Sequence, residues 1–371
     1  MAGKPGYGSL NGLFMRYSKW WKELRRSVKK RPKIAFARPH QWGKKPCEGH
    51  SFEFIEVPLF GTQPKLRDGS EMGDAVGGVI TKDGMSIARE IFSDLKPEIF
   101  LFWPMYYLDG SANNLQTVVR FLQDLKMISP NTRFVYGNGN QQGELDFNVQ
   151  AFLPVLDAVL TNSRDPFDYE TFKKAGVHTV GTLYQFGFDP LEHGRFRRME
   201  PTHDCFFAGS QTHDPDKSPK YPFSRWRYDF LLRAHTEFNL VVHGKGRWPF
   251  IAKPYLYGQN FYDAFTKAKI ILGSNHWDLY RYYTRRTVYA LASGRMYLVR
   301  YIPGMEKDFL NHTHLVWFKE IEEGIDAIRY YLNHGDQAEQ IGQAGREKAL
   351  EMFSWRSMQL QFELIASRHL L

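Results

Sequence analysis

The sequence has little cysteine and no long hydrophobic run. Its two cysteines, Cys47 and Cys205, lie far apart in 371 residues, so they build neither a disulfide framework nor a metal-binding knuckle, and a reducing compartment fits. No apolar run approaches the roughly 18 residues that a membrane-spanning helix needs. The first residues also lack the apolar segment of a secretory signal. We therefore expect a cytoplasmic protein (host cytoplasm if the chain is viral) that could still attach to a membrane surface.

Acidic residues are nearly absent from the first 45 positions. These positions hold 13 lysines and arginines against one acid, Glu23, a net charge of +12, whereas the whole chain carries +9. The remainder is therefore slightly acidic, and the basicity belongs to an N-terminal arm. Such an arm suits a polyanion, either nucleic acid or an anionic membrane surface, although a solubilising tail is the simpler alternative. The residues that we expect to contact the polyanionic acceptor are Lys19, Lys22, Arg25 and Arg26.

An apolar stripe accompanies this positive charge within residues 1–30. Its members recur at spacings of three and four, which indicates one face of a helix: Phe14, Tyr17, Trp21, Leu24 and Val28. A basic amphipathic helix of this kind can lie on a membrane or approach DNA phosphates. Alternatively, the stripe packs on the protein's own first domain.

Residues 31–190 alternate between short apolar runs and helical patterns. The predicted strands are 34–37, 52–60, 98–103, 133–136 and 158–161, and the predicted helices are 85–95, capped by Asp83, and 115–125. This alternation predicts β-α units and a parallel sheet. Because ligands of such sheets bind at the carboxyl ends of the strands, the loops that follow those ends are the places to look for chemistry.

A second α/β series follows a polar linker at 191–200. Strands are predicted at 204–208, 240–242, 270–272 and 296–299, with helices at 225–238, 261–267, 287–292, 320–332 and 336–352. Residues 201–352 thus form a second domain. Residues 353–371 form a last helix, capped by Ser354, which we expect to pack back toward the first domain. Two such domains imply a cleft between them, a common place for a nucleotide.

Three stretches of the second half carry a resemblance to a known family. They are 206–210 (FFAGS) with 225–227 (RWR); 272–275 (LGSN) with 282–294 (YYTRRTVYALASG) and 301–309 (YIPGMEKDF); and 341–346 (IGQAGR) with 353–356 (FSWR). Their order resembles the CgeB-like, spore-maturation type glycosyltransferases, and phage DNA glycosyltransferases are a related option. The resemblance implies a GT-B-like α/β fold: two Rossmann-like domains whose parallel sheets face a central cleft. It also implies a metal-independent enzyme without a cofactor, whose co-substrate is a nucleotide sugar, with a UDP-sugar as our first expectation.

The resemblance places the donor in the second domain and the acceptor in the first. A diphosphate leaving group needs positive charge and backbone N–H groups. The residues that we expect at the donor are Gly209, Ser210, Arg225, Lys245, Arg286, Tyr289 and Glu306, with further glycine turns at Gly244 and Gly246. Arg286 occupies the position of the family's arginine at a helix start, which is electrostatically poor for a cation unless an anion is also there.

The chain departs from the family pattern at a pair of glutamates. Retaining GT-B enzymes often carry two glutamates eight positions apart, the second of which binds the ribose; Arg281 and Tyr289 stand here instead. Tyr289 or Glu306 would have to replace the ribose contact. The donor's identity and the choice between retention and inversion stay open. A non-catalytic nucleotide-sugar or nucleic-acid binding module is the alternative function.

Glycosyl transfer needs a base for the acceptor hydroxyl, or a donor phosphate that does that work. Asp109 is our first candidate and His40 the second, with Glu144 and Asp146 as further loop carboxylates, although each alone is more often a loop or capping residue. The acceptor is a hydroxymethylated pyrimidine in DNA or a saccharide or lipid-linked glycan. His312 and His314 could face one way on a strand as a metal pair would, but no third ligand is evident, so we interpret them as structural.

Overall fold

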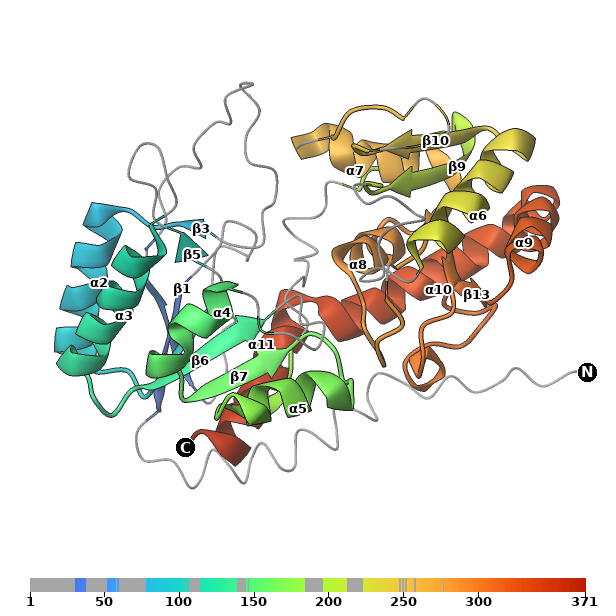
Figure 1. The fold of residues 1–371 in the computed structure, drawn as a ribbon. Coiled ribbons are helices and arrows are strands. Elements are labelled where there is room, and N and C mark those ends of the chain that lie inside the picture. The colour runs from blue at the N-terminus through green and yellow to red at the C-terminus, as the bar shows by residue number, and fades with distance from the viewer. Residues whose placement is uncertain are drawn as a thin grey trace, which may run out of the picture.

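The computed structural model places the chain in two α/β domains, each built on a parallel sheet (Figure 1). The residues that the structure describes are 31–37, 52–57, 59, 78–103, 105–106, 114–138, 145, 147–183, 196–211, 223–246, 248, 250, 252–256, 258–275 and 277–371.

The first domain has a six-stranded parallel sheet in the order β2-β1-β4-β6-β7-β8. Its strands are β1 (Lys33–Ala37), β2 (Glu53–Val57), β4 (Ile99–Phe102), β6 (Arg133–Asn138), β7 (Ala158–Thr161) and β8 (His178–Thr182). A small parallel pair joins β3 (Gly78–Val79) to β5 (Met105–Tyr106). The helices are α2 (Lys82–Leu95), α3 (Leu115–Ile128), α4 (Phe147–Phe152), the 3-10 turn η1 (Leu153–Val155) and α5 (Pro166–Lys174).

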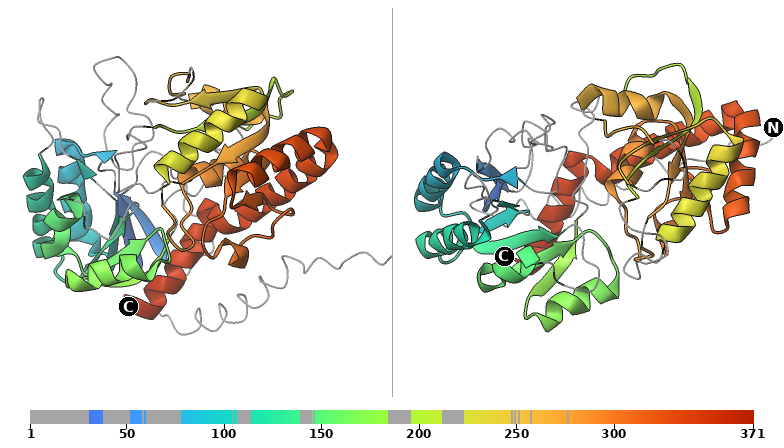
Figure 2. Two further views of the ribbon diagram at one scale, coloured as in Figure 1. Left: turned by 45° about the vertical axis from the view of Figure 1, so that its right-hand side comes forward. Right: turned by 45° about the horizontal axis from the view of Figure 1, so that its top comes forward.

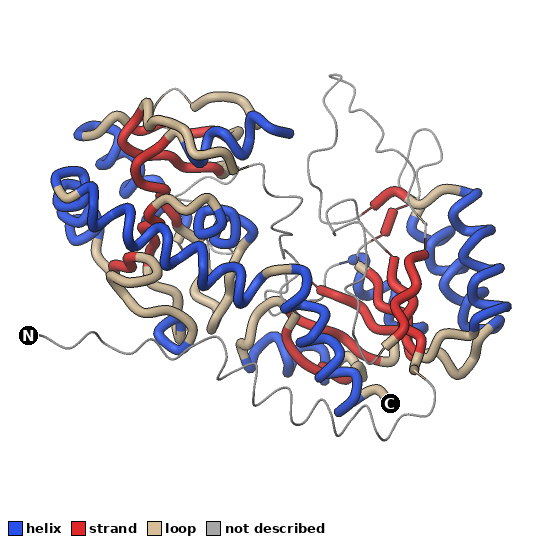
Figure 3. Tube along the Cα trace, turned by 180° about the vertical axis from the view of Figure 1, so that it is seen from behind, coloured by secondary structure: helices blue, strands red, loops and turns tan. Residues whose placement is uncertain are grey.

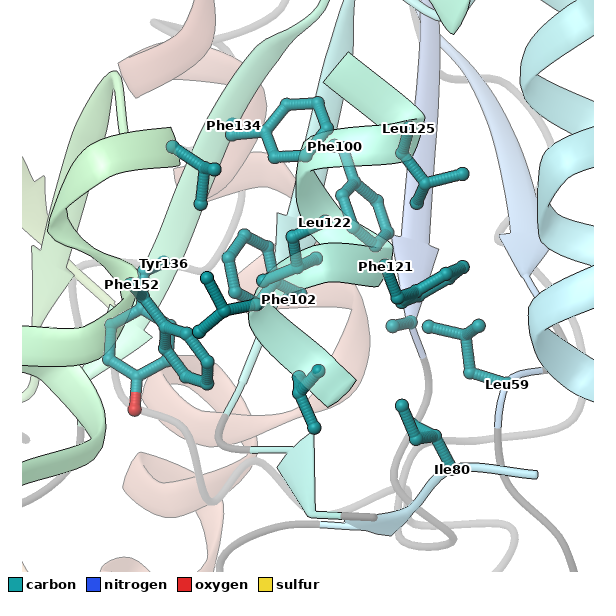
Figure 4. Packing of buried hydrophobic residues seen from close by; sticks show 14 of the residues in the cluster. Leu59, Ile80, Phe100, Phe102, Phe121, Leu122, Leu125, Phe134, Tyr136 and Phe152 are labelled. Atoms are coloured by element: carbon teal, nitrogen blue, oxygen red, sulfur yellow. The ribbon is translucent and has the colours of Figure 1, made fainter. Parts of the chain in front are cut away.

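One face of this sheet is covered by α2, α3 and α4. Aromatic side chains of neighbouring strands meet there beneath α3 (Figure 4). Phe100 and Phe134 pack edge to face with ring centroids 5.4 Å apart, and Tyr136 meets Phe152 of α4 at 5.7 Å. The cap of α2 differs from our expectation, because the Oγ1 atom of Thr81 accepts from the Gly84 N–H at 3.0 Å and Asp83 lies inside the first turn.

The other face of the first sheet is covered by the end of the chain. Helix α10 (Gly335–Phe353) lies in the second domain, and α11 (Trp355–His369) continues from it onto the first (Figures 2 and 3). Met358 and Phe362 of α11 are buried with Ile34, Leu101 and other residues of the strands. Ser354 caps α11, as predicted, by accepting from the Ser357 N–H at 3.3 Å.

The second domain has a five-stranded parallel sheet in the order β10-β9-β11-β12-β13. Its strands are β9 (His203–Ala208), β10 (Leu240–His243), β11 (Ala268–Gly273), β12 (Met296–Arg300) and β13 (Val316–Phe318). Its helices are α6 (Ser224–Glu237), α7 (Gly258–Thr266), α8 (Arg285–Ala292), η2 (Met305–Lys307), α9 (Ile321–Asn333) and α10. Phe196, within the predicted linker, packs edge-on against Tyr262 at 5.1 Å in this domain's core, so the end of the linker is part of the second domain.

The two domains touch through a loop of each. The backbone N–H of Arg164 donates to the Tyr280 carbonyl at 3.1 Å, and the Tyr280 N–H donates to Asp165 Oδ2 at 2.9 Å. Tyr282 shares a side-chain hydrogen bond with Asn162, and burial raises the pKa of Tyr282 to about 12. The segment that leads from β11 into α8 is therefore held against the first domain.

The histidine pair at 312 and 314 lies in a turn before β13, not on a strand. His312 Nδ1 pairs with the Tyr331 hydroxyl at 2.7 Å, and His314 Nδ1 accepts from the Leu310 N–H at 3.0 Å. Both histidines thus have structural hydrogen bonds. The described residues contain no cluster of three or more potential metal ligands. Across the same ranges, no helix is long and apolar enough to cross a membrane.

Candidate functional site

The candidate site lies at the carboxyl edge of the second sheet. Strand β9 ends at Ala208 and leads into Gly209 and Ser210, and its neighbour β11 ends at Gly273 and leads into Ser274. Helix α8 begins 12 positions after the end of β11. Parallel sheets bind ligands at this edge, where loops and helix N-termini meet.

Arg286 joins these two loops. Its Nε donates to the Ala208 carbonyl and its Nη1 donates to the Ser274 carbonyl at 2.8 Å. The guanidinium carbon lies 4.3 Å from the centroid of the Phe207 ring, a cation–π distance. The residue is partly exposed, and no carboxylate of the described ranges forms an ion pair with it. The positive charge of Arg286 is therefore stabilised by two neutral carbonyls and the face of the Phe207 ring.

The electrostatics at Arg286 favour an anion. Burial lowers the pKa of its guanidinium, against the opposing effect of the Tyr297 and Tyr282 hydroxyls. Arg286 is the second residue of α8, whose first turn has no acid and receives no hydrogen bond from the Thr284 side chain. A helix N-terminus repels a cation and attracts an anion. A bound phosphate would satisfy both the arginine and the helix.

The buried arginine of α6 is Arg227, which belongs to the motif 225–227 but was not among the site residues that we expected. Arg227 is 2% exposed; its Nη1 donates to the Ser210 carbonyl at 3.2 Å and its Nη2 to the Ser274 carbonyl at 2.7 Å. The predicted Arg225 instead pairs with Asp229 on the outside of the helix, with Nε 2.9 Å from Oδ2. The helical spacing could have indicated that Arg227 is buried. It stands three, four and seven positions before the buried residues Phe230, Leu231 and Ala234, on the same face of the helix.

Gly209 lies directly against the Arg286 side chain. A Cβ built on Gly209 would be 2.4 Å from Arg286 Nη2 and 2.8 Å from Phe207 Cε1. The absence of a side chain is thus what lets the guanidinium approach this loop. Gly209, Ser210 and Arg286 thus lie together at this edge, and their role in donor binding stays a prediction.

The loop after β10 pairs with the loop after β9. The Gly209 N–H donates to the His243 carbonyl and the Gln211 N–H to the Lys245 carbonyl, both at 2.9 Å. Gly244 has φ +155°, and a Cβ on it would be 1.8 Å from the Gly209 carbonyl oxygen, so this glycine serves the close approach of the two loops. Lys245 is exposed; its N–H donates to Ser210 Oγ at 3.3 Å and its Nζ lies 5.6 Å from the Tyr255 ring centroid.

Tyr289 does not line this edge in the way we expected. Its ring is 3% exposed and packs edge-on against Phe261 at 5.4 Å and Tyr262 at 6.0 Å. The ring lies in the domain core, so it is badly placed for the ribose contact that we considered for it. Arg281, the other substituted position, forms a partly buried bidentate pair with Asp308.

Glu306 is exposed on η2, after β12, the next strand beyond β11 in the sheet. Its Oε2 accepts from the Tyr301 hydroxyl at 2.9 Å. Its own backbone N–H and that hydroxyl hold the pKa of the carboxyl below its usual value. Glu306 is therefore an ionised carboxylate on the same edge as Arg286.

The remaining candidates lie outside the described residues: Asp109, His40, Glu144, Asp146, Lys19, Lys22, Arg25 and Arg26. The strands that precede two of them are described. Strands β1 and β4 are parallel neighbours, so their carboxyl ends lie side by side. In sequence, His40 follows the end of β1 by three positions, and Asp109 follows the end of β4 by seven with the short strand β5 between them.

Residues 225–363 match a protein family described as glycosyl transferase-like, a segment that contains Arg227 and Arg286. No curated protein matches the chain in sequence. Among solved structures, an alpha-glucosyltransferase in complex with UDP-glucose and DNA containing an abasic site has a TM-score of 0.58 and 12% identity, covering 91% of this chain and 99% of that chain. Anabaena Alr3699/HepE in complex with UDP-glucose has a TM-score of 0.50 and 12% identity, and the match covers 91% of this chain and 99% of that chain. The chain thus shares their two-domain GT-B fold.

Proposed function

We propose that this GT-B glycosyltransferase moves a sugar from a UDP-sugar to a hydroxyl acceptor, with the donor diphosphate bound at Arg286. The observation that carries the proposal is Arg286 at the start of α8, a partly exposed residue whose guanidinium donates to the Ala208 and Ser274 carbonyls. Both solved structures named above hold UDP-glucose, which supports uridine as the nucleoside. The motif order further suggests the CgeB-like type within these enzymes.

The donor groups have distinct roles in this proposal. Arg286 stabilises the negative charge that develops on the leaving diphosphate, together with the N–H groups at the start of α8. Lys245 and Ser210 extend the polar edge toward the loop after β10. Glu306 is the carboxylate that we propose for the ribose hydroxyls, because the Tyr289 ring is enclosed in the core. These groups bind and orient the donor.

The acceptor base is proposed in the first domain. Asp109 is the first candidate and His40 the second, because each follows the carboxyl end of one of two neighbouring strands, β4 and β1. A base there would remove the proton from the acceptor hydroxyl as the glycosidic bond forms. Replacement of Asp109 by Asn should then reduce transfer while UDP binding is kept.

DNA that carries a hydroxymethylated pyrimidine is the acceptor that we favour. The N-terminal arm has the charge for a polyanion, and the structure with the TM-score of 0.58 contains DNA. A saccharide or lipid-linked glycan at an anionic membrane is the second candidate, which the same arm charge would serve. Removal of residues 1–30 takes away a net charge of +7. The truncated protein should still hydrolyse donor but bind acceptor more weakly, with a difference that shrinks as salt rises.

Donor hydrolysis tests the central proposal. The protein is incubated with UDP-sugars and with sugars of other nucleotides, and release of the nucleoside diphosphate is measured. Arg286→Ala should abolish release, whereas Arg89→Ala, which breaks an exposed pair with Asp124 in the first domain, should not. If no donor is hydrolysed or transferred, the non-catalytic binding module becomes the better interpretation. Binding to duplex DNA, measured by gel shift, is then compared with binding to anionic vesicles, measured by co-sedimentation. Binding to only one of the two identifies the acceptor.

A further inference from the structure

We propose that Arg227 is a positioning residue of the donor site, which acts on the diphosphate through Arg286 and the loops around it. The inference rests on the proposed function, since it concerns the same ligand. Arg227 belongs to α6, which follows β9, whereas Arg286 belongs to α8, which follows β11. Two helices from separate β-α units thus contribute one arginine each to the same edge.

The contacts of Arg227 tie two loops together. One guanidinium nitrogen donates to the Ser210 carbonyl, after β9, and the other donates to the Ser274 carbonyl, after β11. The Ser274 oxygen also accepts from Arg286 Nη1, at 2.8 Å against 2.7 Å for Arg227 Nη2. The two arginines further share the Phe207 ring, at 5.6 Å for Arg227 and 4.3 Å for Arg286. Movement of Arg227 would therefore release one of the oxygens that hold Arg286.

Arg227 does not itself reach a ligand. It is 2% exposed, whereas Arg286 is partly exposed. It acts on Arg286 in two ways: it fixes the Ser274 carbonyl to which Arg286 donates, and it adds a second positive charge nearby. Burial lowers the pKa of Arg227 most, and repulsion from the neighbouring positive charge of Arg286 lowers it further. The repulsion is relieved by an anion at Arg286, and more so by a ligand with more negative charge.

A lysine cannot reproduce this arrangement. The planar guanidinium presents separate N–H groups to the two carbonyls, whereas an ammonium is a single point that keeps only the charge. Replacement by lysine therefore separates the geometric role from the electrostatic one. Replacement by methionine removes both with a side chain of comparable length.

The test measures the affinity of uridine, UMP and UDP for the wild-type protein and its variants by calorimetry. Arg227→Met should weaken the binding of UDP by about tenfold or more, the binding of UMP by less, and the binding of uridine by under about twofold. The preference for UDP over UMP therefore shrinks. Arg227→Lys should weaken UDP but keep most of that preference. Arg233→Met is the matched control, because Arg233 lies on the same helix in an exposed pair with Glu237 and should leave all three affinities unchanged.

Circular dichroism shows whether each variant folds. Should Arg227→Met fail to fold, Arg227→Gln carries the test, since its amide can donate to one of the two carbonyls without charge, and the preference for UDP should again shrink. Equal weakening of all three ligands, or unchanged affinities in a folded variant, would assign Arg227 a merely structural role and overturn the inference alone. Failure of the wild-type protein to bind UDP would overturn the proposed function and this inference together.

Discussion

Replacement of Gly209 by alanine separates the position of Arg286 from its charge. The new Cβ would lie 2.4 Å from Arg286 Nη2 and 2.8 Å from Phe207 Cε1, closer than atoms can approach. The end of an arginine side chain can move, so the guanidinium would turn away from the loop after β9. The protein would keep its full positive charge at this edge, with the charge displaced.

The two effects of this substitution differ in size. Overpacking of this kind costs about 1–3 kcal/mol of stability, which leaves most domains folded. A displaced arginine loses its charged hydrogen bond to the diphosphate, worth about 1.5–3 kcal/mol. Because 1.4 kcal/mol corresponds to about a tenfold change, UDP should bind about 10- to 100-fold more weakly.

Calorimetric titration with UDP measures this loss, and thermal unfolding confirms that the variant is folded. Gly335→Ala is the control, since a Cβ on Gly335 meets no atom within 4 Å and the residue begins α10, far along the chain from the loop. Should the folded Gly209→Ala protein bind UDP as the wild type does, the diphosphate does not depend on Arg286 in the position described. The donor site would then have to be sought elsewhere.

Three further substitutions test contacts of the fold by urea unfolding. Asp165→Ala removes both the cap of α5 and the acceptor of an interdomain N–H, so it should cost at least as much as a lost cap, about 0.5–2 kcal/mol. An unchanged stability would mean that neither contact contributes. Phe362→Ala should cost about 3–5 kcal/mol, because the ring is buried against the first sheet; the half-exposed Leu360 on the same helix is the control, and equal losses at both would contradict the packing. Asp308→Ala leaves the partly buried Arg281 without its carboxylate and should cost about 1–3 kcal/mol. A loss below about 1 kcal/mol would show that the pair is not desolvated.

The sheets were largely predictable because central parallel strands are buried on both faces and appear as short apolar runs. Strand β7 has the predicted bounds, and β9 and β12 differ by one residue. Strand β8 was missed for a physical reason: it is an edge strand in which Val180 alone is fully buried, so it carries no apolar run. Strand β13 was missed because three residues are too few to form a pattern.

The site was less predictable, because a motif locates a residue in sequence but not the direction of its side chain. The position of Arg286 at this edge was expected from its match to the family's arginine at a helix start, and its role in donor binding stays a prediction. Arg225 and Arg227 are two positions apart on a helix, so only one of them can face the sheet, and the apolar residues of α6 identify Arg227. Tyr289 follows Arg286 by three positions on α8, yet its large ring turns into the aromatic core, where a glutamate would not be accommodated.

Helix α11, formed by the last residues of the chain, covers one face of the first domain's sheet. Residues of α11 close the face of a sheet whose strands were made more than 170 positions earlier. During synthesis, one apolar face of that sheet therefore stays exposed until the second domain and the last helix have left the ribosome. The two domains are therefore interleaved in sequence, and a cut at the predicted linker would produce an incomplete first half. Any redesign of the first domain therefore has to include the last helix.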